Sequence, residues 1–421
     1  MKRSTSIATS SRVQLCQHNR LSMTRPHDQD DAWRRLDPLT RRAIILGAAS
    51  TSVVTAGGGL AGVLSPPARR LSATPVLPPR MRGLNLELSP GSLSPAIARE
   101  LAGWGINTVR INFSTDVASH LAQEGKVERP TTSDPLAPYR RALAMLKLFT
   151  AECARLGVGV ILGASAIYGR DKVNLEDSTG ASFRAGVGRN LMQLWTAMAQ
   201  ELRDDPAIIA YDVLGEPNYT MRREVDGAVW YEQIMPEAIR RIRSINPHIW
   251  IAVMPWPWGY AHRYSSMRVI DDPAILYSFH FYSPHSYTHQ GIGNLPRGPR
   301  YPGKVSEHPG SQVQDWNKAA LAQAMQPAFD FARRNNVRVM TGEFGVTRWA
   351  SGRDRWIADM LSVLEDNGVD WMFHTYNAWN GWNPTFAPDA PGVSEYPTLF
   401  GGVNSPGHQT LLRYWRQNLL A

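Results

Sequence analysis

Strand and helix signals alternate along this chain from about residue 80 to its C-terminal end, and this alternation limits the possible folds more than any other feature. Several strand signals, such as 158–163 and 249–254, are almost continuously apolar, as parallel strands buried on both faces are. Eight strand–helix units over about 340 residues are typical of a (β/α)8 barrel, or TIM barrel, with loop insertions. We therefore predict an α/β chain whose body, residues 80–421, is a single domain of this fold.

The boundaries follow from apolar periodicity and from capping and turn residues. The expected strands cover residues 82–88, 106–113, 158–163, 208–214, 249–254, 275–282, 336–340 and 369–377. The expected helices cover residues 95–103, 138–156, 183–202, 230–245, 316–334, 353–365 and 408–420, with a short and poorly defined helix before residue 272. An open, doubly wound sheet is the alternative fold. The count of eight and the absence of a glycine-rich phosphate loop after the first strand argue against it.

The first 79 residues do not share this pattern. Residues 1–36 are polar and are expected to be disordered, and residues 65–79 form an expected proline-rich linker. Between them, residues 37–64 resemble a twin-arginine export signal, with Arg41 and Arg42 followed by a weakly hydrophobic segment. The alternative is a membrane anchor through residues 43–64, which are numerous enough to span a bilayer. We expect a chain exported to the periplasm or the extracellular space by the twin-arginine machinery, with a tether through residues 43–64 as the variant.

Charge and cysteine content exclude two classes of protein for the body. The net charge of +9 comes from residues 1–80, which hold 12 Lys and Arg against 4 Asp and Glu, whereas the remainder holds 33 against 32. A nucleic-acid-binding body would carry a basic excess. The two cysteines are Cys16, which precedes the body, and Cys153, in an expected helix, so the body holds no internal disulfide.

Two glutamates follow strands in similar surroundings. Gly215-Glu216-Pro217-Asn218 comes directly after the fourth expected strand, and Gly342-Glu343-Phe344-Gly345 follows the seventh. One such glutamate alone is most simply a surface carboxylate or a neighbour of a helix cap. In a barrel, however, the C-terminal ends of all strands meet at one mouth, so both side chains should reach the same pocket. A pair of carboxyl groups is what a glycosidase requires.

With this pair in place, the chain resembles glycoside hydrolase family 5 over roughly residues 80–421. The residues that carry the resemblance are Arg110 at the second strand, Gly215-Glu216-Pro217 after the fourth, His280-Phe281-Tyr282 after the sixth, Gly342-Glu343-Phe344-Gly345 after the seventh and Trp379 after the eighth. The resemblance implies a single catalytic barrel in which Glu216 is the acid/base and Glu343 the nucleophile. It also implies that Arg110 and Tyr282 hold the nucleophile's carboxylate. His280 would then lie close to both glutamates, and Trp379 would form the floor under the sugar.

The chemistry of a retaining glycosidase agrees with these roles. Its two carboxyl groups must lie about 5–5.5 Å apart so that one can attack the anomeric carbon directly. The nucleophile must stay ionised, and a nearby Arg and a Tyr hydroxyl both favour the charged form. The acid must keep its proton until it donates it, and the negative charge of Glu343 favours the protonated form of Glu216.

Two positions depart from the family pattern. The family places Asn directly before the acid/base, where it bonds the sugar's 2-hydroxyl, and this chain has Gly215. Asn218 is a candidate substitute. The third strand ends in Ala164-Ser165-Ala166, where the family often carries His. These changes motivate a competing hypothesis, a carbohydrate-binding barrel with impaired catalysis.

Aromatic residues after strand ends are candidates for sugar stacking, since sugar faces pack on flat rings. We expect Trp256, Trp258, Trp379 and Trp382 at the mouth, with about half of them taken up by ordinary packing instead. The tryptophans expected in the core are Trp104, Trp195, Trp230 and Trp371. His280, His285 and His289 could also be read as metal ligands, but no cluster with zinc spacing supports this. His374 is expected inside the eighth strand as a core residue.

The sequence therefore predicts a retaining β-glycosidase that uses no metal and no cofactor. Its expected partner is a polysaccharide or oligosaccharide substrate, a β-linked glucan, mannan or related polymer, and we expect a monomer that binds no nucleic acid. The insertions at residues 168–190 and 284–316 are expected to shape the substrate groove. A barrel hydrolase of another bond, such as an amidase, would need a metal site or an activated Ser or Cys, and the sequence indicates neither.

Overall fold

The computed structural model describes residues 74–88, 93–113, 133–164, 181–217, 227–376, 378–386 and 405–420, with the backbone alone for 181–190. The predicted export signal and Asn218 lie outside these residues. None of the helices in the described part of the chain has the length and hydropathy of a segment that crosses a bilayer.

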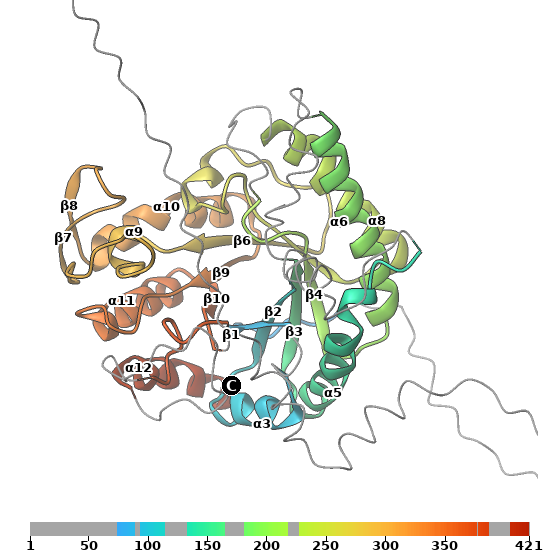
Figure 1. Ribbon diagram of the computed structural model, residues 1–421, viewed down its shortest axis with the longest axis horizontal. Coiled ribbons are helices and arrows are strands. Elements are labelled where there is room, and N and C mark those ends of the chain that lie inside the picture. Colours follow the sequence, from blue (N-terminus) through green and yellow to red (C-terminus); the bar gives the residue numbers. More distant parts are fainter. Residues whose placement is uncertain are drawn as a thin grey trace, which may run out of the picture.

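Eight parallel strands close into a barrel, which confirms the predicted fold (Figure 1). The strands, in chain order, are β1 (Arg82–Glu87), β2 (Thr108–Phe113), β3 (Gly159–Ala164), β4 (Ile208–Asp212), β5 (Trp250–Val253), β6 (Ile275–Phe281), β9 (Val339–Phe344) and β10 (Asp370–Phe373). The first strand pairs with both β2 and β10, so the sheet has no open edge. This closure excludes the doubly wound alternative.

Helices surround the barrel in Figure 1. The main helices are α3 (Pro95–Gly103), α5 (Arg140–Leu156), α6 (Ala181–Leu202), α8 (Met235–Ile245), α10 (Lys318–Asn335), α11 (Arg353–Asp366) and α12 (Pro406–Trp415). Shorter turns are η1 (Ala137–Tyr139), the π-helix η3 (Trp230–Ile234), η4 (Ala261–Ser265), α9 (His285–Thr288) and η5 (Arg416–Leu419). Ser94 caps α3 as predicted, because its hydroxyl accepts from the backbone N–H of Ile97. Gly157 ends α5 in the left-handed conformation that glycine adopts at low cost.

One predicted helix begins too early. Trp316 was expected to begin a helix, but it ends β8 (Val313–Trp316), which pairs with β7 (Gly303–Ser306) in an antiparallel hairpin. The helix α10 starts after it because the side chain of Asn317 accepts from the N–H of Ala320. The predicted helix 230–245 has the expected bounds, but it opens with a π-helical turn before Pro236, a residue without an N–H for the helical ladder.

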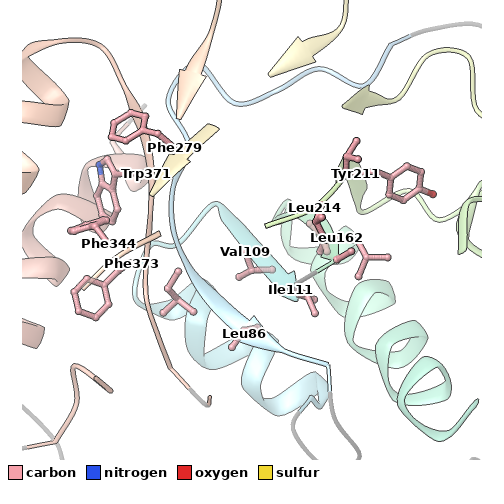
Figure 2. Packing of buried hydrophobic residues seen from close by; sticks show 14 of the residues in the cluster. Leu86, Val109, Ile111, Leu162, Tyr211, Leu214, Phe279, Phe344, Trp371 and Phe373 are labelled. Carbon is pink, nitrogen blue, oxygen red and sulfur yellow. The ribbon is translucent and has the colours of Figure 1, made fainter. Parts of the chain in front are cut away.

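Much of the core lies on the outer face of the strands, under the helices. Figure 2 shows Leu86, Val109 and Ile111 of β1 and β2 in one part of this layer, and Phe344, Trp371 and Phe373 of β9 and β10 in another. Trp195, Trp230 and Trp371 are fully buried as predicted, and Trp104 is half-buried against the same cluster.

A second cluster fills the bottom of the barrel and includes part of the expected linker. It consists of Leu77, Met81, Ile161, Ile209, Ala210, Ala252, Leu276, Met340 and Met372. The backbone around Leu77 is held as well, since Trp250 Nε1 donates to the Pro75 carbonyl at 2.8 Å and Arg338 Nη2 donates to the Pro78 carbonyl at 2.6 Å. Residues 74–79 thus form the floor of the barrel rather than a free spacer.

Replacing Leu77 tests this floor. Leu77→Ala should destabilise the protein by about 2 kcal/mol, because it leaves a cavity among apolar side chains. The matched control is Val76→Ala, since Val76 is 92% exposed and should contribute almost nothing. Equal urea midpoints for the two variants would show that the segment does not stabilise the barrel.

Candidate active site

The C-terminal ends of the strands open into a cavity of about 600 Å³. Its lining includes Glu216 after β4, His280 and Tyr282 at the end of β6, Glu343 on β9, and His374 and Trp382 after β10. The barrel therefore brings the two predicted glutamates into one pocket, although 127 positions separate them in the chain (343 minus 216).

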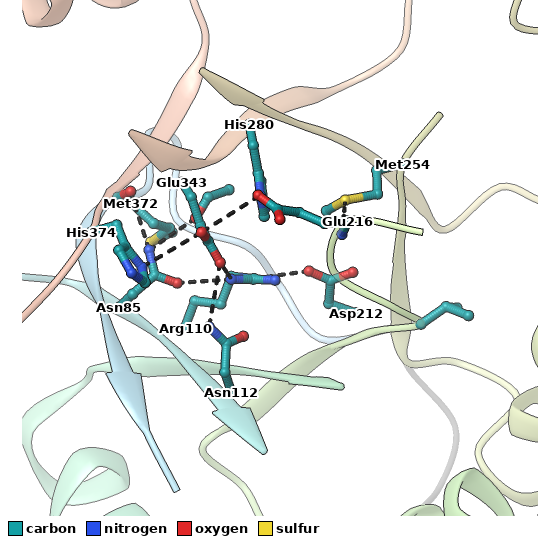
Figure 3. A network of polar contacts seen from close by, with 12 residues as sticks. Asn85, Arg110, Asn112, Asp212, Glu216, Met254, His280, Glu343, Met372 and His374 are labelled. Atoms are coloured by element: carbon teal, nitrogen blue, oxygen red, sulfur yellow. Dashed lines mark hydrogen bonds and ion pairs between the residues drawn. The ribbon is translucent and has the colours of Figure 1, made fainter. Parts of the chain in front are cut away.

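Glu343 is held from two sides. Arg110 Nη1 donates to its Oε1 at 2.8 Å, and the Tyr282 hydroxyl donates to its Oε2 at 2.8 Å. The amide nitrogen of Asn112 lies 3.4 Å from Oε1 and donates to it as well (Figure 3). With both oxygens engaged, the orientation of this carboxyl group is fixed before any ligand arrives.

Arg110 is itself fully buried and bridges several strands. Its Nε donates to Asp212 Oδ2 at 2.8 Å, and its Nη1 also donates to Asn85 Oδ1 at 2.9 Å. A buried guanidinium requires such partners, since a charge without compensation is strongly unfavourable away from water. Asp212 and Glu343 thus share one buried cation between them.

The surroundings favour the ionised form of Glu343. Burial by itself raises the pKa of Glu343, but the charges of His280, His374 and Arg110 and the hydrogen bond from Tyr282 outweigh it and hold the pKa well below its usual range. Because burial lowers the pKa of His374 to about 4, that ring is neutral at neutral pH. The effect therefore comes from His280, Arg110 and the hydrogen bond from Tyr282, and Glu343 is a carboxylate at neutral pH.

Glu216 faces Glu343 across the cavity. Its backbone has a φ of 51°, an uncommon value for a residue with a side chain, and its N–H donates to the sulfur of Met254 at 3.0 Å. His280 Nδ1 lies 2.9 Å from Glu216 Oε1 and 3.5 Å from Glu343 Oε2, so one imidazole contacts both carboxyl groups. Oxygen atoms of the two glutamates lie within 4.8 Å of each other.

The glycines beside Glu343 leave room for neighbouring parts of the chain rather than for a ligand. A Cβ atom on Gly342 would lie 2.5 Å from Ser278 Oγ and 3.3 Å from His280 Nε2. A Cβ on Gly345 would lie 2.3 Å from the carbonyl oxygen of His374. Both positions need glycine because the side chain and backbone that complete the site approach them so closely.

The predicted tryptophans separate into two groups. Trp258 and Trp382 line the cavity, and Trp382 stacks on Tyr282 with ring centres 5.4 Å apart. Trp256 is buried with its ring against Gly227 and is not among the lining residues, so its role in sugar stacking stays a prediction. Trp379 packs edge-on against Trp382 at 5.8 Å and is not among the lining residues, so its role as a sugar floor stays a prediction.

The sequence analysis did not assign four of the residues found in the site. His374 was expected in the core, but β10 ends at Phe373, and His374 Nδ1 lies 3.6 Å from Glu343 Oε2. Asn85, Asn112 and Asp212 are polar residues at buried positions of β1, β2 and β4, and all three contact Arg110 or Glu343. Their one sequence signal is this polarity, together with the two-residue spacing of Arg110 and Asn112, which places both on one face of β2.

Another group of side chains that line the cavity belongs to the insertion after β6. His285 and His289 stack with ring centres 3.9 Å apart, and His308 lies 5.2 Å from His285. Burial lowers the pKa of His285 to about 4 and that of His289 to about 3, so both rings are neutral at neutral pH. Trp316 and Glu307 line the same cavity. Part of the insertion 284–316 therefore borders the cavity.

Glu216, His280 and Glu343 are a possible metal-binding group among the described residues. Their possible ligand atoms lie within 4.8 Å of one another. Both oxygens of Glu343 already accept hydrogen bonds, and a divalent cation would stand close to the positive charge of Arg110. This donor set fits a pair of hydrogen-bonded carboxyl groups better than a metal centre.

Comparisons with known proteins identify a family and relatives of this chain. The model of the cellulase family, glycosyl hydrolase family 5, matches residues 72–380. Endoglucanase C of Acetivibrio thermocellus is 26% identical over 209 residues, which cover 44% of this chain and 59% of that protein. Cellodextrinase A of Ruminococcus flavefaciens is 22% identical over 294 residues, which cover 69% of this chain and 81% of that protein. The chain thus spans well under two thirds of endoglucanase C.

Solved structures share the fold. A hyperthermophilic endo-beta-1,4-glucanase in complex with substrate aligns with a TM-score of 0.59 at 18% identity, over 80% of this chain and 97% of that one. Cel5A of Thermotoga maritima in complex with mannotriose aligns with a TM-score of 0.57 at 17% identity, over 79% and 97%. At these identities the likeness establishes the barrel and no more.

The bridge through Arg110 makes a prediction about stability. Asp212→Asn should cost about 3 kcal/mol of unfolding free energy, because it removes one of two carboxylates from a fully buried guanidinium. Glu237→Gln, which breaks a solvent-exposed pair with Arg241 on α8, is the control and should shift the urea midpoint little. A small effect of Asp212→Asn would mean that Arg110 does not depend on this partner.

Proposed function

The chain belongs to the cellulase family, glycosyl hydrolase family 5. We propose that it hydrolyses β-linked polysaccharides by a retaining, two-glutamate mechanism. The observation that carries the proposal is the approach of Glu216 and Glu343 to within 4.8 Å, oxygen to oxygen. Retaining enzymes hold their carboxyl groups about 5–5.5 Å apart, whereas inverting enzymes leave about 6.5–9.5 Å for a water molecule.

In the first step, Glu343 attacks the anomeric carbon while Glu216 gives its proton to the departing glycosidic oxygen. The C–O bond to the leaving group breaks, and a C–O bond to Glu343 forms. Arg110 and Tyr282 hold the attacking carboxylate in place and keep it ionised until then.

In the second step, Glu216 is a carboxylate and removes a proton from water, which attacks the same carbon and releases Glu343. The change of role follows from charge. Once Glu343 is esterified, the negative charge nearest to Glu216 has gone, so ionised Glu216 is no longer opposed by it. His280 contacts both carboxyl groups throughout and keeps them facing each other.

The substrate we propose is a β-glucan, with a β-mannan as the second choice. The relatives are named endoglucanase and cellodextrinase, and one structural neighbour is a complex with mannotriose. The rings of Trp258 and Trp382 in the cavity suit stacking against sugar faces. We also propose that the enzyme is exported by the twin-arginine route, which Arg41 and Arg42 suggest, and that it acts outside the cytoplasm. We propose that it works as a monomer.

Gly215 favours a second candidate, a barrel that binds carbohydrate with impaired turnover. Asn218 lies outside the described residues, so its role as a substitute for the missing amide stays a prediction. The intact pair of glutamates with Arg110 and Tyr282 supports the enzyme instead.

Reducing-sugar release on β-glucan, mannan and xylan tests the proposal. We expect turnover on at least one polymer, and Glu343→Gln should lower kcat about a thousandfold or more because an amide cannot act as the nucleophile. Binding without turnover by the unaltered protein would favour the second candidate.

An aryl glycoside with a good leaving group separates the two glutamates. Glu216→Gln should release a burst of phenolate equal to the enzyme concentration, because such a group leaves without an acid and the glycosyl-enzyme then accumulates. Glu343→Gln should give no burst. A burst in neither variant, despite turnover by the unaltered enzyme, would contradict the assigned roles.

A further inference from the structure

The short helix α9 reaches back to Tyr282, the residue whose hydroxyl donates to Glu343. Its last residue is Thr288, which is fully buried, and the Thr288 hydroxyl donates to the carbonyl oxygen of Tyr282 at 2.5 Å. The backbone N–H of Thr347, in the loop after β9, donates to the carbonyl oxygen of Thr288 at 2.9 Å. Thr288 therefore links the residue after β6 to the loop that follows Glu343.

The next residue, His289, packs against the ring of Tyr282. The two ring centres lie 5.1 Å apart and the ring planes meet at 70°. His289 also lies perpendicular to Trp382, with centres 4.9 Å apart, and Trp382 stacks on Tyr282 at 5.4 Å. The three rings thus contact one another in pairs. A tyrosine ring that is packed in this way has little freedom to rotate.

The hydrogen bonds around Thr288 determine which nitrogen of His289 carries the hydrogen. A threonine hydroxyl has a single hydrogen, and Thr288 gives it to the carbonyl of Tyr282. Thr288 Oγ1 lies 2.9 Å from His289 Nδ1, so in this second bond the oxygen accepts and Nδ1 donates. In a neutral ring, Nε2 is then an acceptor.

A second hydrogen on the His289 ring would be unfavourable. The titratable groups around the ring are His285 of α9, His308 of the hairpin, His374 after β10 and Tyr282 after β6, with Glu343 bonded to Tyr282 and Glu307 bonded to the backbone of His285. Burial, and then the other histidines, lower the pKa of His289 to about 3. A cation here would also lie face to face with the His285 ring, whose centre is 3.9 Å away.

We propose that His289, with its hydrogen on Nδ1, is a positioning residue for Tyr282 and, through Tyr282, for the carboxylate of Glu343. The proposal rests on the function proposed above, since it assigns Glu343 the role of nucleophile. The Nδ1–H group occupies a lone pair of Thr288 Oγ1, so the hydroxyl hydrogen stays directed at the Tyr282 carbonyl. The imidazole ring limits the rotation of the phenol, which keeps the Tyr282 hydroxyl on Glu343 Oε2.

The kinetic test is a double-mutant cycle with Tyr282. His289→Ala should lower kcat about tenfold with little change in KM, because it loosens the nucleophile rather than the sugar. In a Tyr282→Phe background the same change should alter kcat less than about twofold, because there is no hydroxyl left to hold. Equal losses in both backgrounds would overturn the proposal. So would a rise in KM with kcat unchanged, which would mean that His289 contacts the sugar instead.

A matched pair of changes at Thr288 tests the link between the two residues. Thr288→Val has nearly the same shape but no hydroxyl, so it should reproduce most of the loss of kcat that His289→Ala causes. Thr288→Ser keeps the hydroxyl and should recover most of that loss. A Val variant as fast as the unaltered enzyme, or a Ser variant as slow as the Val variant, would contradict a role for this hydroxyl and overturn the proposal.

Nitrogen-15 NMR of the histidine rings tests the position of the hydrogen without turnover, with His289→Asn to assign the signals. The His289 ring should be neutral, carry its hydrogen on Nδ1 at pH 6 and remain neutral down to about pH 4. A hydrogen on Nε2, or a cationic ring at pH 6, would overturn the proposal. If the unaltered protein turned over no polysaccharide, the proposed function would fail. The NMR signals, and the cycle with Tyr282→Phe measured as unfolding free energies, would still decide whether His289 holds Tyr282.

Discussion

The contact between Arg110 and the two carboxylates Asp212 and Glu343 is the interaction on which the site depends. It joins β2 to β4 and to β9, which are strands from different parts of the barrel wall. Because a buried guanidinium is costly without its partners, the barrel is most stable when these strands are in register. The same register places Glu343 opposite Glu216, so the forces that close the barrel also assemble the reacting groups.

Close packing then narrows the freedom of each group. Gly342 lets His280 approach β9, and His280 in turn contacts both glutamates. Tyr282 binds Glu343 and is covered by the stacked ring of Trp382. Each of the two glutamates is thus held by a residue that is itself immobilised by packing, which is how a site stays preorganised without a ligand.

The sequence was sufficient for the barrel and for the position of both glutamates, because these follow from local periodicity and from the rule that strand ends converge. It was insufficient where a contact depends on the neighbouring strand. Asp212 lies 102 positions from its partner Arg110, and Asn112 lies 231 positions from Glu343. No local pattern identifies such pairs. A place after a strand also does not determine where a side chain points, and Trp256, for example, is buried against Gly227.

The floor of the barrel makes its two ends different. Residues 74–79 pack under the strands, at the end opposite the cavity, and the chain enters β1 from there. The segment that closes the bottom of the barrel therefore lies away from Glu216 and Glu343, and the cavity opens at the other end.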